Sequence, residues 1–303
     1  MLVLDERRPN LGTRGFWEVA AYALVSDKQL LADKCLLHRR HIVKMVHCRQ
    51  SGHMGGSLSA TELATTLYYS FLRQDPQNPK WDGRDYAVWS KGHASPLAYS
   101  ILADLGYFPK AELGTFRKFG SRLQGHVDRL KVPGIEASTG TLGQGLSVSL
   151  GIALGLRLDR LPNHVWAITS DGEHEEGQMW EAIMAAAQYK ADNLTVILDY
   201  NKKQLSGPVD KIMDVAPLAD KYRAFNWNVI EIDGHDIPQI IDAYKKALVL
   251  KGKPTVIIAS TVKGKGVSVF EQEASGFHGA PPCDADFELA MAELGPAKWP
   301  DFF

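Results

Sequence analysis

The sequence lacks the features that would assign it to several special classes of protein. Its 303 residues include only three cysteines, Cys35, Cys48 and Cys283, which are too few and too scattered for a disulfide framework or a zinc site. No apolar run approaches the roughly 18 residues of a membrane span, and the first residues turn charged too early for a secretory signal. Lys and Arg number 34 against 35 Asp and Glu, so neither nucleic acid nor membrane is expected as a partner. We predict a globular protein of the reducing cytoplasm.

Strand and helix signals alternate along most of the chain. Runs rich in β-branched residues predict strands at 86–90, 165–170, 194–200, 228–233 and 255–261. Helical periodicity predicts helices at 27–49, 59–73, 142–159, 175–190, 215–223 and 237–251, the first with Asp27 as its N-cap. This alternation indicates an α/β fold, a doubly wound, mostly parallel sheet with helices on both faces.

The same signals divide the chain into three parts. We predict an N-terminal arm at 1–26, a main domain at 27–282, and a C-terminal helix with an aromatic tail at 283–303. In an open parallel sheet, ligands bind beyond the carboxyl ends of the strands. The residues that directly follow the predicted strands of the main domain are therefore the first candidates for a functional site.

Two polar residues in these positions predict a metal site. Asp171 follows the strand at 165–170, and Asn201 follows the strand at 194–200. A carboxylate and an amide oxygen suit Mg²⁺, which commonly completes its coordination with phosphate and water. Gly172 would let the backbone approach such a phosphate closely. In the plainer alternative, Asp171 caps the following helix and Asn201 lies in a turn.

Several glycine-containing segments, taken together with this pair, resemble the transketolase family. Ser-Asp-Gly at 170–172 followed by Asn201 resembles the diphosphate motif of thiamine-diphosphate enzymes, with Ser170 where a glycine usually stands. The remaining matching segments, in the family's order, are Ser-Gly-His-Met-Gly-Gly at 51–56, Ser-Lys-Gly-His-Ala at 90–94, Gly-His at 125–126, Thr-Gly-Thr-Leu-Gly-Gln-Gly at 139–145 and Phe-His-Gly-Ala-Pro at 277–281. The resemblance therefore spans residues 30–282, most of the chain.

The resemblance implies a thiamine-diphosphate-binding fold and assigns ligands to the cofactor and its metal. Mg²⁺, for which Ca²⁺ or Mn²⁺ could substitute, would be held by Asp171, Asn201 and the backbone carbonyl of Lys203. Thiamine diphosphate would contact His93, Gly140, Leu142, Gly172, Glu173, Asn201 and His278. Gly140 and Leu142 would lie against the aminopyrimidine ring of the cofactor.

The resemblance also assigns a catalytic role to four histidines. Histidine can donate a hydrogen bond to phosphate or hydroxyl oxygens and can exchange a proton near neutral pH. His93 and His278 would contact the diphosphate and the reacting sugar, whereas His53 and His126 would contact the sugar hydroxyls near the bond being broken. The other histidines are interpreted as ordinary surface or core residues; they are His38, His41, His47, His164, His174 and His235.

Four further charged residues, two glutamates and two lysines, receive a weaker interpretation or none. In the family, Glu176 and Glu181 would belong to an acidic network that links two active sites across a dimer. Their plain alternative is a first-turn acid favoured by the helix dipole and a solvated carboxylate. Lys263 and Lys265 follow the last predicted strand, but they do not form a Walker phosphate loop and receive no role.

The family pattern predicts that a second polypeptide is needed. A complete transketolase has a second half, which binds the aminopyrimidine ring and supplies the glutamate that activates it. Nothing after Pro282 corresponds to that half. The resemblance therefore implies the diphosphate-binding subunit of a split transketolase of pentose phosphate metabolism, paired with a C-terminal, pyrimidine-binding subunit in an α2β2 heterotetramer. Together they would transfer a two-carbon ketol unit from a ketose or its phosphate to an aldose or its phosphate.

Three alternatives remain open from the sequence. One is a subunit of another thiamine-diphosphate enzyme, of the deoxyxylulose-phosphate synthase or dehydrogenase E1 type, since these share the metal motif. Another is a non-catalytic regulatory subunit that has kept the fold. A nucleotide-binding protein is the weakest, because the chain contains neither Gly-x-Gly-x-x-Gly nor a Walker loop.

Overall fold

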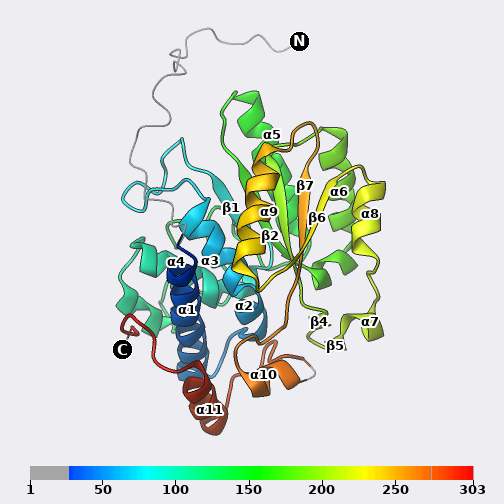
Figure 1. Cartoon of the computed structure of the whole chain (residues 1–303). Coiled ribbons are helices and arrows are strands. Elements are labelled where there is room, and N and C mark those ends of the chain that lie inside the picture. The colour runs from blue at the N-terminus through cyan, green and yellow to red at the C-terminus, as the bar shows by residue number, and fades with distance from the viewer. Residues whose placement is uncertain (1–26, 274, 303) are drawn as a thin grey trace.

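A computed structural model describes residues 27–273 and 275–302, so the predicted arm at 1–26 lies outside the described residues (Figure 1). Its central sheet has five parallel strands in the order β1-β2-β3-β7-β6. The strands are β1 Tyr86–Trp89, β2 Val165–Ser170, β3 Leu194–Tyr200, β6 Asn228–Asp233 and β7 Thr255–Ser260. Each predicted strand is confirmed to within one residue, and so is the parallel sheet.

Helices cover both faces of this sheet, as the doubly wound prediction requires (Figure 1). One face carries α1 Lys28–Arg49, α3 Thr61–Ser70, α4 Ser95–Leu105 and α9 Ile237–Val249, and the other carries α5 Gln144–Leu158, α6 Gly177–Gln188 and α8 Leu218–Ala224. Alternate strand residues enter alternate cores: Ile168 and Ile197 face the first, Ala167 and Val196 the second. Because both of their faces are buried, the central strands β2, β3 and β7 are largely apolar, whereas the edge strand β6 exposes Glu231.

The predicted helix at 59–73 is wrong at its start, because the glycine-rich segment before it is itself helical. The chain forms α2 Gly55–Ser59 and then α3 Thr61–Ser70. A Cβ at Gly55 would lie 1.7 Å from the carbonyl oxygen of Gly276, and one at Gly56 would lie 3.2 Å from His93 Nε2. These glycines therefore allow close approach of other segments rather than a turn.

The predicted helix at 175–190 is also divided. Asp171–Glu175 forms a 3₁₀ turn (η3), and α6 begins only at Gly177. Ser170 and Glu173 form a capping box in which Glu173 Oε2 accepts from the Ser170 amide at 3.0 Å. This box fixes the chain directly after β2 and holds Asp171 at the sheet edge.

The remaining elements lie around the rim of the sheet and at the C-terminal end. They are η1 Gly92–Ala94, η2 Lys110–Thr115, β4 Lys203–Gln204, β5 Gly207–Pro208, α7 Val209–Ile212, α10 Ser268–Gln272 and α11 Asp284–Leu294. The helix α11 packs on α1, and Asp301 beyond it pairs with Arg40 and Lys44 at 2.8 and 2.7 Å. In the part of the chain that the structure describes, no helix is both long and apolar enough to cross a membrane.

Buried histidines outside the candidate site should make the fold sensitive to acid. Burial lowers the pKa of His164 from 6.5 to about 3, and its Nε2 lies 2.8 Å from Thr195 Oγ1. The folded chain keeps this ring neutral, whereas the unfolded chain protonates it below about pH 6.5. The free energy of unfolding therefore decreases as the pH is lowered. Between pH 7 and 5 this one ring should cost about 2 kcal/mol. Measured by urea unfolding, the free energy of unfolding of His164→Gln should therefore decrease less between pH 7 and pH 5 than that of the unsubstituted chain. An equal decrease in both would contradict this account.

Candidate active site

The predicted metal ligands meet at the carboxyl edge of the sheet. β2 and β3 pair in register, with Ser170 opposite Asp199, so the residues that follow the two strands emerge side by side. The Asp171 carboxylate is buried; its Oδ1 accepts from the Gly172 amide at 2.9 Å and its Oδ2 from the Lys202 amide. Asn201 Oδ1 accepts from the Lys203 amide at 3.2 Å.

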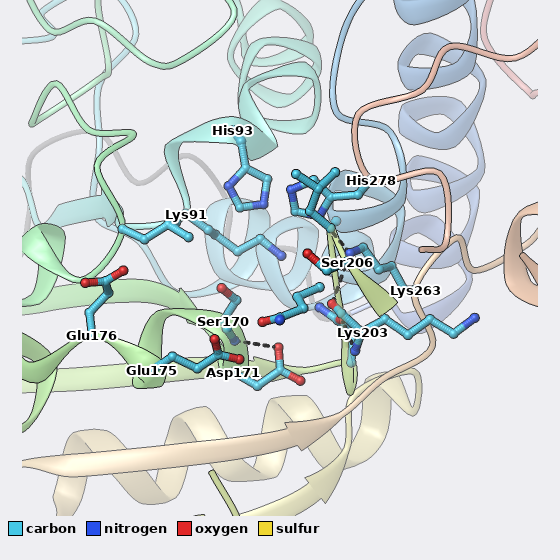
Figure 2. A pocket seen from close by; sticks show the side chains of 16 residues that line it. Lys91, His93, Ser170, Asp171, Glu175, Glu176, Lys203, Ser206, Lys263 and His278 are labelled. Carbon is cyan, nitrogen blue, oxygen red and sulfur yellow. Dashed lines mark hydrogen bonds between the residues drawn. The ribbon is translucent and has the colours of Figure 1, made fainter. Parts of the chain in front are cut away.

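Both residues open into a cavity of about 300 Å³ that crosses this edge (Figure 2). Asp171 and Glu175 lie on one side of it, and the rings of His93 and His278 face it from the other. The lining is completed by Gly56, Lys91, Leu142, Ser170, Gly172, Glu176, Asn201, Lys203, Gln204, Leu205, Ser206 and Lys263. The cavity thus joins carboxylate, amide, ammonium and imidazole groups from segments that are far apart in the sequence.

The environment of Asp171 fits a bound cation. Burial, with a smaller contribution from the charge of nearby Asp199, raises the pKa of this carboxyl to about 7. Within the described residues Asp171 takes part in no salt bridge, and the two backbone amides and the charge of Lys91 offset its burial only in part, since its pKa stays raised. No group of three His, Cys, Asp or Glu side chains in that part of the chain could hold a metal alone. A cation here would depend on Asp171, the Asn201 amide oxygen and other oxygens, which is the donor set that Mg²⁺ prefers.

A buried ion pair, which could not be identified from the sequence, orients the side chain of Asn201. Asp199 pairs with Lys91, and both side chains are 0% exposed. Asp199 also accepts from Ser59 Oγ at 2.6 Å and from Asn201 Nδ2 at 3.2 Å. The Asn201 amide is thereby turned so that its oxygen, not its nitrogen, is directed away from Asp199. The available signal was a charged residue within an otherwise apolar strand.

Lys263, which received no role from the sequence, lies in the cavity wall. Its Nζ donates to the backbone carbonyl of Lys203 at 3.0 Å and lies 2.7 Å from His278 Nδ1. Burial, with a smaller contribution from the charge of Lys91, lowers the pKa of Lys263 to about 7. It forms no salt bridge with any carboxylate among the residues the structure describes. A buried ammonium of this kind fits an anion such as a diphosphate.

The ammonium group of Lys203, unlike that of Lys263, is held by backbone carbonyls of the segment at 271–273. Its Nζ donates to the backbone carbonyls of Glu271 and Glu273 at 2.7 and 2.8 Å. Its backbone carbonyl, the predicted third metal ligand, instead accepts from Lys263 Nζ.

The four predicted catalytic histidines come together, although they derive from four separate segments. The ring of His53 lies 5.4 Å from that of His93, 5.5 Å from His126 and 5.4 Å from His278, between centroids. His93 and His278 are 5.1 Å apart. Burial is the main cause of lowered pKa values throughout, to about 4 at His53 and about 3 at His278. All four rings are therefore neutral at pH 7.

The structure does not bring every predicted cofactor ligand to the cavity. Glu173 is buried behind it and accepts from Ser90 Oγ at 2.5 Å and from the Gly143 amide at 3.0 Å. Its carboxylate therefore ties three segments together, including the capping box, instead of lining the cavity. Gly140 lies beside His126 in an adjoining hollow, where a Cβ would be 2.8 Å from His126 Cδ2.

The two predicted network acids are exposed in this chain. Glu176 lies at the rim of the cavity just before α6. Glu181 lies one turn into α6 and does not line the cavity. Glu176 does contact the motif at 139–145, since a Cβ on Gly143 would lie 2.8 Å from Glu176 Cβ.

Comparison with known proteins gives concordant matches. The family described as "Transketolase, thiamine diphosphate binding domain" matches residues 34–302. A 6-deoxy-6-sulfo-D-fructose transketolase subunit of Clostridium sp. is 40% identical over 86% of this chain and 96% of its own length. One of the apulose-4-phosphate transketolase subunits of Phocaeicola vulgatus is 38% identical over 89% of this chain and 94% of its length. The crystal structure of a transketolase from Campylobacter jejuni superposes with a TM-score of 0.85 at 31% identity; it covers 91% of this chain, which spans only 44% of that one.

Proposed function

Because this chain belongs to the family of transketolase thiamine diphosphate-binding domains, we propose that it is the diphosphate-binding subunit of a split transketolase. With a separate pyrimidine-binding subunit, it transfers a two-carbon ketol unit from a ketose or its phosphate to an aldose or its phosphate. The observation that carries this proposal is the cavity that joins Asp171 and Asn201 to the histidine cluster at the sheet edge. The proposal is further supported by the similarity to separate transketolase subunits, because the matches extend over nearly the whole length of those subunits.

The proposed cofactor is thiamine diphosphate with Mg²⁺. Asp171, the Asn201 amide oxygen and the Lys203 carbonyl would hold the metal, and Lys263, His93 and His278 would face the diphosphate. When bound, the thiazolium ring supplies the electron sink for cleavage of the carbon–carbon bond. The protein's part is to neutralise the diphosphate charge and to fix its position at the sheet edge.

The histidines act on the sugar as neutral groups in this proposal. His126 is exposed and its ring lies next to that of the half-buried His53, and both would donate hydrogen bonds to hydroxyl oxygens near the bond that breaks. His278, which shares a wall with Lys263, would exchange the proton of the reacting hydroxyl. A neutral imidazole ring has one nitrogen that donates a hydrogen bond and one that accepts, so each of these histidines can do both.

A separate subunit would cover the exposed face of α5 and α6. Gly151 and Gly155 lie in the middle of α5, where glycine costs about 1 kcal/mol relative to alanine, yet a Cβ on either would touch nothing within 4 Å in this chain. Val148 and Met184 are 42% and 57% exposed on the same pair of helices. Such a surface suits close packing of another chain, and we propose the pyrimidine-binding subunit as its occupant, in an α2β2 assembly with Glu176 and Glu181 near the contact.

All three cysteines are free thiols, which supports a cytoplasmic location.

A comparison of donors tests the proposed reaction against its nearest rival. The chain and its partner subunit would be supplied with Mg²⁺, thiamine diphosphate, an aldose acceptor and either a ketose phosphate or pyruvate. We expect turnover with the ketose phosphate and none with pyruvate. Turnover with pyruvate alone would instead indicate an enzyme of the deoxyxylulose-phosphate synthase or dehydrogenase type.

A further inference from the structure

Arg117 lies next to His53 of the histidine cluster, and the proposed function gives it no role so far. It follows η2 and adopts a left-handed backbone conformation, with φ of +54°. This conformation is uncommon for a residue other than glycine and persists only where the surrounding structure demands it. Its side chain, half-buried, runs from the loop at 116–126 toward the turn that carries His53.

The guanidinium group contacts that turn in two places. Arg117 Nη1 donates to Ser51 Oγ at 2.6 Å, and Nη2 lies 3.3 Å from His53 Nδ1. The preceding residue supports the same turn, because a Cβ on Gly52 would lie 3.1 Å from the ring of Phe116. The side chains of Phe116 and Arg117, which are consecutive in the sequence, thus both contact the turn at 51–53.

The same guanidinium group also lies against the loop that carries His126. A Cβ on Gly125 would lie 2.5 Å from Arg117 Nη2 and 2.6 Å from Cζ, so the backbone there rests directly on the guanidinium plane. Only glycine leaves this space. Arg117 therefore connects the positions of two cluster histidines that are 73 residues apart in the sequence, His53 and His126.

The chemistry of the contact determines where the His53 proton lies. A guanidinium group has only donors and is not deprotonated in proteins. His53 Nδ1 must therefore accept, which places the ring proton on Nε2. That nitrogen is directed toward the segment of His278, since it lies 3.9 Å from a Cβ built on Gly279.

We propose that Arg117 is a positioning residue that fixes His53 as the neutral Nε2–H tautomer, so that His53 presents a hydrogen-bond donor to an oxygen of the sugar. The part of this inference that concerns the sugar rests on the proposed function; the tautomer does not. In this role His53 recognises a hydroxyl or carbonyl oxygen of the substrate rather than removing a proton from it, because the nitrogen facing the site already carries one.

Nitrogen-15 NMR of the histidine rings in the full chain at pH 7 tests the tautomer directly. The His53 signals are assigned by their loss in His53→Asn. We expect the Nε2–H pattern in the unsubstituted chain and a mixture of tautomers in Arg117→Gln. Arg122→Gln is the matched control, because Arg122 lies on the same loop but pairs with Glu112 at 2.8 Å, and it should leave the His53 signals unchanged. An Nδ1–H or doubly protonated His53, or an unchanged pattern in Arg117→Gln, overturns the proposal.

Ketol transfer with the partner subunit tests the role of this tautomer. Arg117→Gln should lower kcat by about 10- to 100-fold, as small misplacements of reacting groups do, with thiamine diphosphate affinity within about twofold of the unsubstituted chain. Arg117→Lys, which keeps a donor, should recover part of the loss, and thermal unfolding confirms that both variants fold. An unchanged kcat overturns the positioning role. If the tautomer is observed but no variant transfers a ketol unit, the proposed function fails while the tautomer assignment stands.

Discussion

Asp171→Ala should abolish ketol transfer and weaken the retention of Mg²⁺ and thiamine diphosphate at least about 100-fold, more than the loss of an outer-shell partner costs. Asp171 is the one buried carboxylate that lines the cavity, and it takes part in no salt bridge among the described residues. Its removal would leave the proposed metal with neutral oxygen ligands only. Calorimetric titration of the chain with cofactor and metal, together with the transfer assay, measures both effects.

The stability of the same variant separates loss of binding from loss of folding. A buried carboxylate without a salt bridge destabilises the ligand-free chain, so Asp171→Ala should unfold at the same urea concentration as the unsubstituted chain or a higher one. Asp210→Ala, at an exposed position on α7, is the matched control and should change neither binding nor stability. Unchanged cofactor affinity in Asp171→Ala would show that the metal binds elsewhere.

Lys91→Met should destabilise the fold by about 3–5 kcal/mol, because it leaves the Asp199 carboxylate buried without its partner. The pair is fully buried, and Asp199 also holds Ser59 and Asn201. The charge of Lys91 holds the pKa of Asp199 below its usual value despite burial. Denaturant unfolding at pH 7 measures the loss.

A double-mutant cycle tests the pairing itself. Asp199→Asn alone should cost a similar amount, and Lys91→Met combined with Asp199→Asn should cost less than the sum of the two, by at least about 1 kcal/mol. Arg223→Met, which breaks an exposed pair with Glu231, should change stability by less than about 1 kcal/mol. Additive losses for Lys91 and Asp199 would contradict the coupling.

The strands and the metal pair could be predicted because local patterns determine them. A short β-branched run buried on both faces has few alternatives, and the residues after parallel strands necessarily meet at one edge. The positions of Asp171 and Asn201 follow from that rule alone. The helix starts at 55 and 177 could not be predicted in the same way, since they depend on contacts of Gly55 with Gly276 and on the capping box of Ser170 and Glu173.

The supporting residues of the site were not predictable from local sequence. Lys91 and Asp199 are 108 positions apart, and Arg117 and His53 are 64 apart. A lysine or arginine in a polar segment is ordinarily solvated, so its burial becomes visible only when the fold brings its partner to it. Glu173 also depends on distant contacts: it lies in the metal motif, yet its carboxylate accepts from the backbone amides of Gly143 and Ser170.

The central claim is that this chain forms an active site only with a separate pyrimidine-binding subunit. The measurement that tests it most directly is ketol transfer from a ketose phosphate to an aldose, with Mg²⁺ and thiamine diphosphate, by this chain alone, by the candidate partner alone and by the mixture. We predict activity in the mixture only, and its loss when the chain carries His278→Ala. Activity of this chain alone would contradict the claim, and so would a mixture that binds the cofactor in a stable complex but transfers no ketol unit.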